Sequence, residues 1–127
     1  MPTRQRVNVF IALFESGAHV EAIEQFYAED ASMQENGHPP RRGLALLVEH
    51  ERAALASLKS MRTLPAQSVL VDGDMVVIQW IFEYVTQVGE TFRMEEIAHQ
   101  RWRGDRIAEE QFFYDPAQRK TPIGPNP

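Results

Sequence analysis

The sequence contains no cysteine among its 127 residues. Disulfide bonds, thiolate zinc sites and a cysteine nucleophile are therefore excluded. It also has no apolar run near the roughly 20 residues that a membrane-spanning helix requires. The stretch MPTRQRVNVFIALFESG includes a short apolar segment, but Glu15 interrupts it and its spacing is helical, which is not typical of a signal peptide. We expect a cytoplasmic protein without a membrane partner.

The sequence has no excess of positive charge either. Its 13 Lys and Arg residues stand against 18 Asp and Glu residues, a formal net charge of −5. This balance argues against a nucleic-acid or anionic-membrane partner. No His-x-x-x-His or His-x-His spacing, phosphate-binding glycine loop or GxSxG motif occurs. We therefore expect no metal and no cofactor.

The first half of the chain has helical periodicity. Apolar residues between Val7 and Phe14 recur at helical spacing and stop at Ser16-Gly17, a typical end of a helix. The run from Asn36 to Pro40 can only be a loop. The expected elements are a helix over residues 7–14, a short helix over 20–27, a strand over 31–36 and a longer helix over 43–58.

The second half of the chain changes to a period of two. The expected strands cover residues 62–71, 75–85, 91–103 and 106–114, separated by glycine-containing turns. Helices followed by long antiparallel strands predict an α+β domain, with three helices on the concave face of a strongly curved, mostly antiparallel sheet. We expect this domain to cover residues 1–115. Residues 116–127 contain four prolines and are expected to form a tail, loose or draped over the surface.

Three stretches carry a resemblance to a known superfamily. They are Tyr27-Ala28-Glu29-Asp30-Ala31-Ser32-Met33, Pro40-Arg41-Arg42-Gly43 and Arg101-Trp102-Arg103-Gly104-Asp105-Arg106-Ile107. In this order and spacing the chain resembles the ketosteroid isomerase and SnoaL-like polyketide cyclase superfamily, also called nuclear transport factor 2-like or cystatin-like. The resemblance implies a cone-shaped domain around a largely apolar pocket for a small hydrophobic ligand.

The ketosteroid isomerase pattern is only partly present. The resemblance places Glu35 where that family has its general base, but Phe10 and Ala98 stand where it has the two donors of its oxyanion hole. Neither phenylalanine nor alanine can donate a hydrogen bond to a dienolate oxygen. Classical steroid isomerisation is therefore not expected. Glu35 is a candidate general base, and a solvated acid at a strand end is the alternative.

The position of Ala98 also suggests which strand face points inward. Residues of the same parity on this strand include Glu96, Gln100 and Trp102, and we expect Ile107, Glu109, Gln111 and Phe113 to face them on the returning strand. A carboxylate inside an apolar cone would have a raised pKa and could act as an acid or base, which makes Glu96 the second candidate catalytic residue. The alternative is that Glu96 lies at the open mouth or pairs with Arg93.

Further residues are expected to contact the ligand. Tyr27 and Tyr84 could donate phenolic hydrogen bonds to a carbonyl group, and His38 lies on the loop at the expected entrance, unless it is simply exposed. His19 and His50 lie on helix faces and receive no role. The aromatic members of the set could equally be core. The predicted ligand-contacting residues are Phe10, Tyr27, His38, Trp80, Phe82, Tyr84, Met94, Ala98, Gln100, Trp102, Gln111 and Phe113.

The outward face of the predicted sheet carries more apolar groups than a solvated surface needs. Related domains commonly pair two sheets back to back, so we expect a homodimer through this face. The residues expected there are Met75, Val77, Ile81, Val85 and Ile97.

The sequence leaves open whether the pocket is catalytic. The leading hypothesis is a SnoaL-like enzyme of an isomerase, cyclase or lyase type, which uses Glu35 or Glu96 for cofactor-independent acid/base chemistry on a small hydrophobic carbonyl or polyketide-like compound. The alternative is a noncatalytic domain that binds a small molecule in the same pocket. A third hypothesis, an adaptor for a protein partner, rests only on the apolar outer face.

Overall fold

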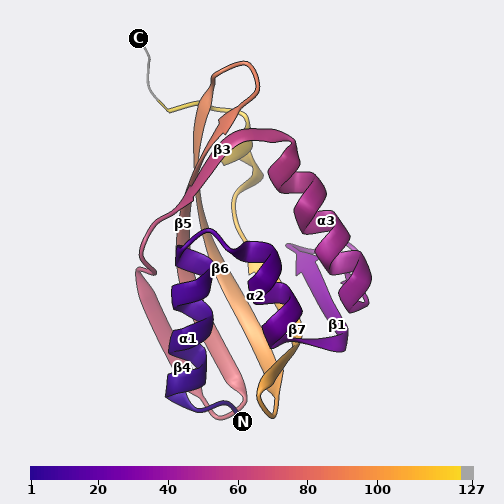
Figure 1. The fold of residues 1–127 in the computed structure, drawn as a ribbon. Coiled ribbons are helices and arrows are strands. Elements are labelled where there is room, and N and C mark those ends of the chain that lie inside the picture. The colour runs from indigo at the N-terminus through magenta and orange to yellow at the C-terminus, as the bar shows by residue number, and fades with distance from the viewer. Residues whose placement is uncertain (124–127) are drawn as a thin grey trace.

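The computed structural model describes residues 1–123, which form helices packed against one strongly curved sheet (Figure 1). Most of the helical structure precedes the long strands in the chain, as the change of periodicity predicts. The elements are α1 (Arg4–Glu15), α2 (His19–Phe26), β1 (Tyr27–Glu35), β2 (Arg41–Arg42), α3 (Leu44–Ala56), β3 (Leu58–Thr63), β4 (Ser68–Asp72), β5 (Met75–Thr86), β6 (Thr91–Arg103), β7 (Arg106–Phe113) and the 3-10 helix η1 (Pro116–Arg119).

The first helix shows how local sequence sets the boundaries of an element. The Thr3 hydroxyl accepts a hydrogen bond from the Arg6 backbone N–H at 3.0 Å and so caps the start of α1. The chain leaves the helix at Gly17, whose φ of 92° is readily adopted by glycine. Val7 and Phe10 face the sheet and are fully buried. The apolar face of α1 therefore fixes the helix on the sheet.

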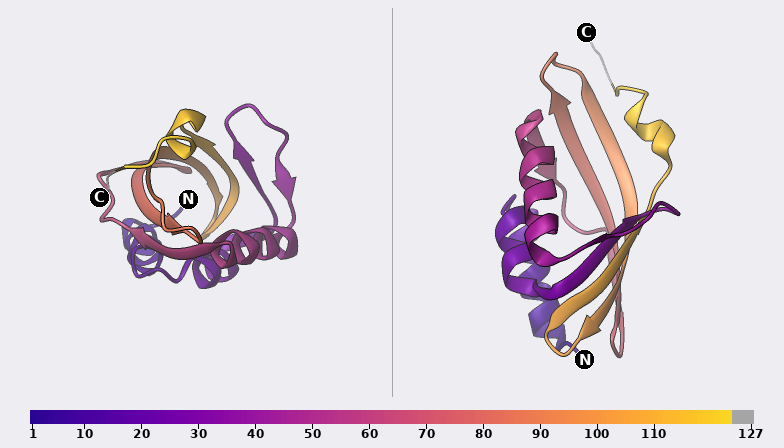
Figure 2. Two further views of the ribbon diagram at one scale, coloured as in Figure 1. Left: turned by 90° about the horizontal axis from the view of Figure 1, so that it is seen from above. Right: turned by 90° about the vertical axis from the view of Figure 1, so that its right-hand side faces the viewer.

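The sheet has the strand order β2-β1-β7-β6-β5-β3, with β4 also paired to β5. β1 runs parallel to β7, and the other described strand pairs are antiparallel. The long strands β5 and β6 curl, so that the sheet forms a half-barrel with the three α-helices across its concave side (Figure 2). The predicted α+β cone is confirmed.

The predicted strand over residues 62–71 is wrong, because the chain forms two strands there. β3 pairs with the second half of β5 and β4 with the first half. Pro65 interrupts the run between them because proline has no N–H to donate to a ladder. The chain nevertheless stays beside β5, since Leu64 N–H donates to the Ile81 carbonyl and Gln67 N–H to the Gln79 carbonyl.

A β-bulge between β6 and β7 reverses the predicted facing of β7. Arg101 pairs with Glu109, but the next residue, Trp102, pairs with Ile107, so that Ala108 is one extra residue on β7. The side-chain period is two, and one extra residue therefore moves every later side chain to the other face. The inward residues beyond the bulge are consequently Glu110 and Phe112, in place of the expected Glu109, Gln111 and Phe113.

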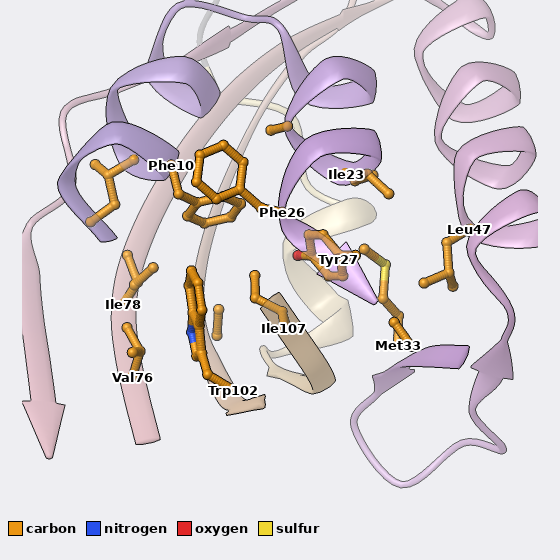
Figure 3. Packing of buried hydrophobic residues seen from close by; sticks show 14 of the residues in the cluster. Phe10, Ile23, Phe26, Tyr27, Met33, Leu47, Val76, Ile78, Trp102 and Ile107 are labelled. Carbon is orange, nitrogen blue, oxygen red and sulfur yellow. The ribbon is translucent and has the colours of Figure 1, made fainter. Parts of the chain in front are cut away.

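Aromatic rings fill the space between the first two helices and the sheet (Figure 3). The Phe10 ring centroid lies 5.4 Å from that of Phe26, 6.2 Å from that of Tyr27 and 6.3 Å from that of Trp102. All four residues are almost completely buried. Edge-to-face aromatic pairs of this kind add to the stabilisation from burial. This part of the cone is therefore solid core and not cavity.

The segment after β7 continues along β6. The Gln118 side-chain oxygen accepts a hydrogen bond from the Glu95 N–H at 2.8 Å, and Ile123 N–H donates to the Thr91 carbonyl. η1 gives this part of the proline-containing tail a defined place beside the sheet (Figure 2). The last four residues of the expected tail, 124–127, lie outside the described residues.

The five apolar residues expected on the outer face of the sheet differ in exposure within the single chain. Ile97 is 37% exposed, whereas Ile81 is buried within the single chain, and Met75, Val77 and Val85 are partly buried. The homodimer through this face remains a prediction. Among residues 1–123, no helix is long and apolar enough to cross a membrane.

Candidate functional site

A cavity of about 460 Å³ lies between the helices and the concave face of the sheet. Every α-helix contributes to its wall, and so do the strands β1, β2, β3, β5, β6 and β7. This volume is within the ~300–1,000 Å³ that is typical of small-molecule sites. The lining residues are Phe14, His19, Ile23, Tyr27, Met33, Glu35, Arg41, His50, Glu51, Ala54, Leu55, Ser57, Leu58, Met61, Phe82, Tyr84, Met94, Glu96, Phe112 and Arg119.

Glu96 brings a carboxyl group into this wall from the middle of β6. Within residues 1–123 its side chain has no hydrogen-bond or ion-pair partner, and its neighbour across the β5–β6 ladder is Trp80. Burial raises the pKa of Glu96 to about 8, and the negative charges of Glu110 and Glu35 act in the same direction against the smaller opposing effect of Arg119. At neutral pH this carboxyl is therefore mostly protonated.

Glu35 enters the same cavity from the end of β1, but its carboxylate is fully engaged. Its Oε1 accepts hydrogen bonds from the Tyr114 hydroxyl at 2.6 Å and from Arg119 Nη2 at 3.1 Å, and its Oε2 accepts from Arg41 Nη2 at 2.7 Å. Burial by itself would raise its pKa, but the hydrogen bonds from Tyr114 and Arg41 and the charges of both arginines lower the pKa to about 2. Glu35 is therefore ionised, and it is a poor base.

A buried polar network adjoins the cavity behind Tyr27. The Tyr27 hydroxyl donates to Glu110 Oε1, Gln100 Nε2 donates to Glu110 Oε2 at 2.7 Å, and Trp102 Nε1 donates to Gln100 Oε1 at 2.9 Å. Burial raises the pKa of Glu110 to about 7, although the two hydrogen bonds that it accepts favour its charged form. Each of these buried polar groups has a partner, as a stable core requires.

His19 forms a second polar group in the cavity wall. Its Nδ1 lies 3.2 Å from Glu51 Oε2, its Nε2 lies 2.7 Å from Thr63 Oγ1, and its ring stacks on Phe14 at 3.9 Å. These contacts from both sides fix the ring orientation. Among residues 1–123, no group of three or more histidine and acidic side chains is arranged to hold a metal ion.

The structure brings six of the fourteen predicted site residues together in the cavity and places the other eight elsewhere. Phe10, Trp80, Ala98 and Trp102 are buried in the core, Gln100 belongs to the buried network, and His38 is exposed on a turn. Beyond the bulge, Gln111 bonds to the Asn36 carbonyl and Phe113 is 45% exposed, so neither lines the cavity. The predicted residues that do line it are Glu35, Glu96, Tyr27, Phe82, Tyr84 and Met94.

Comparison with known proteins identifies the family. A model described as a SnoaL-like domain matches residues 7–110, most of the chain. The chain belongs to the SnoaL-like family. No sequence among curated proteins matches it significantly.

Solved structures of low sequence identity share this SnoaL-like fold. A candidate SnoaL-like polyketide cyclase from Jannaschia sp. CCS1 aligns with a TM-score of 0.80 and 15% identity, over 98% of this chain and 94% of that one. TerC, co-crystallised with polyporic acid, aligns with a TM-score of 0.78 and 17% identity, over 94% and 96%. IdmH, a candidate polyketide cyclase from Streptomyces antibioticus, aligns with a TM-score of 0.73 and 21% identity, over 93% and 98%.

In this SnoaL-like cavity several lining residues were not identified as site residues from the sequence. For His19 and His50 the sequence does contain a signal of an inward position. Each lies one helical turn from an apolar residue that also lines the cavity, Ile23 and Ala54 respectively. No local pattern in the sequence indicates Arg119. It belongs to a tail whose course along β6 is set by long-range hydrogen bonds, such as the one from the Glu95 N–H to Gln118. In the sequence, Arg41 belongs to the stretch Pro40-Arg41-Arg42-Gly43, which indicates the fold and not the site. Its role in the site follows from the approach of β2 to Glu35.

Proposed function

We propose that this SnoaL-like domain is a cofactor-independent enzyme that transfers a proton at the carbon next to a carbonyl group of a small hydrophobic compound. Glu96 acts as its general acid/base. The single observation that carries the proposal is that this carboxyl group lines a mostly apolar cavity without any partner among residues 1–123. A carboxyl with a pKa near the working pH is suited to both donating and accepting a proton.

The cavity also supplies a donor for the carbonyl oxygen. Tyr84 lines the same wall as Glu96, from the neighbouring strand β5, and its ring stacks on Phe92 at 5.3 Å. Burial raises the pKa of the Tyr84 phenol, which therefore remains protonated and able to donate. Tyr27 is less suited, since its hydroxyl already donates to Glu110. In this mechanism Tyr84 hydrogen-bonds the enolate oxygen while Glu96 holds the proton.

Glu35 has a different part in this proposal. Because its carboxylate is bound by Tyr114, Arg41 and Arg119, it holds these side chains at the edge of the cavity and does not act as a base.

The engaged state of Glu35 also supports the alternative, a noncatalytic binding domain, in which the cavity holds a small molecule without transforming it. The two functions differ in whether Glu96 exchanges protons with the ligand.

The test uses 2-tetralone, an apolar bicyclic ketone with exchangeable protons next to its carbonyl group. Proton NMR in D₂O measures deuterium exchange at that carbon in the presence of the protein. We expect wild-type protein to accelerate exchange, and Glu96→Gln to lower the protein-dependent rate by about 10²-fold or more. Glu95→Gln is the matched control, because Glu95 is the next residue and lies exposed on the outer face. Wild-type exchange no faster than in buffer, with binding retained, would favour the noncatalytic alternative.

A further inference from the structure

Two arginines converge on one carboxylate at the edge of the cavity. Arg41 comes from the short edge strand β2 and Arg119 from η1, segments far apart in the sequence. Each uses its Nη2 atom to bind a different oxygen of Glu35, at 2.7 and 3.1 Å. One carboxylate thus faces two guanidinium groups, which leaves a net positive charge at this part of the wall.

The hydrogen-bonding capacity of the arginines is also incompletely used. Arg41 Nε is buried and has no hydrogen-bond partner among the described residues. A buried donor on a charged group without an acceptor is unfavourable, because it has lost its interaction with water. The Arg119 guanidinium lies over the Tyr114 ring, 4.8 Å from its centroid, which holds it at the cavity while half of its side chain remains exposed.

The other acidic groups of the cavity do not neutralise this charge. Glu51 interacts with His19, and Glu96 is mostly protonated at neutral pH because burial raises its pKa to about 8. The apolar wall and the positive edge therefore suit a ligand with two parts, a hydrophobic body and one negatively charged group. Guanidinium groups bind carboxylates and similar oxyanions through paired N–H donors.

We propose that Arg41 and Arg119 form an anion-binding subsite, and that the ligand of the cavity is a hydrophobic anion such as an apolar carboxylic acid. This inference rests on the proposed function in one respect: both take the cavity lined by Glu96 as the ligand site. The ligand's oxyanion accepts hydrogen bonds from Arg41 and Arg119 while its hydrophobic body lies against the residues around Glu96. Glu35 competes with the ligand for both arginines and keeps them in place when the cavity is empty.

Two fluorescent dyes that differ by one charged group test the subsite. 1-Anilinonaphthalene-8-sulfonate carries a sulfonate, and N-phenyl-1-naphthylamine is the same molecule without it. We expect Arg119→Gln and Arg41→Gln each to weaken sulfonate-dye binding about tenfold and to leave the neutral dye within twofold of wild type. Arg42→Gln is the matched control, since Arg42 is adjacent in sequence but does not line this cavity, and it should change neither affinity.

Glu35→Gln provides an effect of opposite sign. It removes the competing charge, so we expect tighter binding of the sulfonate dye and unchanged binding of the neutral dye. If the arginines had a merely structural role, the arginine variants would bind both dyes more weakly, by the same factor. That result would overturn the inference, and so would an unchanged affinity for the sulfonate dye. If neither dye binds wild-type protein, the ligand site fails together with the proposed function. Charge-dependent dye binding without 2-tetralone exchange would overturn the catalytic proposal alone.

Discussion

Glu35 and Glu96 line the same cavity from β1 and β6, yet their pKa values are shifted in opposite directions. Both carboxyl groups lose contact with water, which favours the protonated form. At Glu35 the interactions with Tyr114, Arg41 and Arg119 outweigh this effect and lower the pKa. Glu96 has no partner among residues 1–123, so its pKa stays raised. The cavity therefore contains one fixed negative charge and one carboxyl that can gain or lose a proton near neutral pH.

The raised pKa of Glu96 predicts a pH-dependent effect on stability. The folded-state pKa is about 8 against a model value of 4.5, so between these values the folded chain holds a proton that the unfolded chain has released. Stability is therefore lost as pH rises from about 4.5 to 8. Because glutamine does not titrate, we expect Glu96→Gln to be more stable than wild type at pH 8, by an amount on the order of 2 kcal/mol after allowance for partial exposure.

Urea unfolding at pH 4, 6 and 8 measures this difference. The stability of Glu96→Gln relative to wild type should increase with each step in pH, and Glu95→Gln should follow wild type throughout. A difference between Glu96→Gln and wild type that is the same at all three pH values would show that Glu96 does not titrate in this range.

The hydrogen-bond network around Glu110 predicts that truncating this side chain strongly lowers the stability of the fold. Glu110→Ala leaves the Tyr27 hydroxyl and the Gln100 amide buried without their acceptor. We expect a loss of about 2–4 kcal/mol in the free energy of unfolding. Glu109→Ala is the control from the next position, where a half-exposed ion pair with Arg101 contributes less than about 1 kcal/mol. Chemical denaturation compares the two, and equal losses would contradict the inward position of Glu110.

The outer face of the sheet predicts a dimer that depends on Ile97. Ile97 pairs with Phe113 across the β6–β7 ladder, and both side chains are substantially exposed in the single chain. We expect wild-type protein to sediment as a dimer at micromolar concentration and Ile97→Lys to sediment as a monomer. Val88→Lys, at an 82% exposed position in the turn between β5 and β6, should remain dimeric. A monomeric wild type would exclude this interface.

Much of the fold could be predicted because periodicity is a local property of the chain. The apolar spacing of Val7, Phe10 and Ile11 predicts the buried face of α1, and alternation predicts β5 and β6 as long strands. The single strand predicted before β5 is two strands in the structure, although Pro65 is a visible signal for an interruption. These features depend on neighbouring residues, so one sequence is enough to reveal them.

The candidate site was only partly predictable, since its parts come together through long-range pairing. Glu96 faces inward as its alternation with Ala98 suggests, but the inward facing of Glu110 depends on the extra residue at Ala108. Arg41 is only six residues from Glu35, but Arg119 reaches the same carboxylate from 84 residues further along the chain. Tertiary structure alone decided which carboxyl is paired and which is not. A pKa depends on the charges and water around a group in space, and strand periodicity carries no information about either.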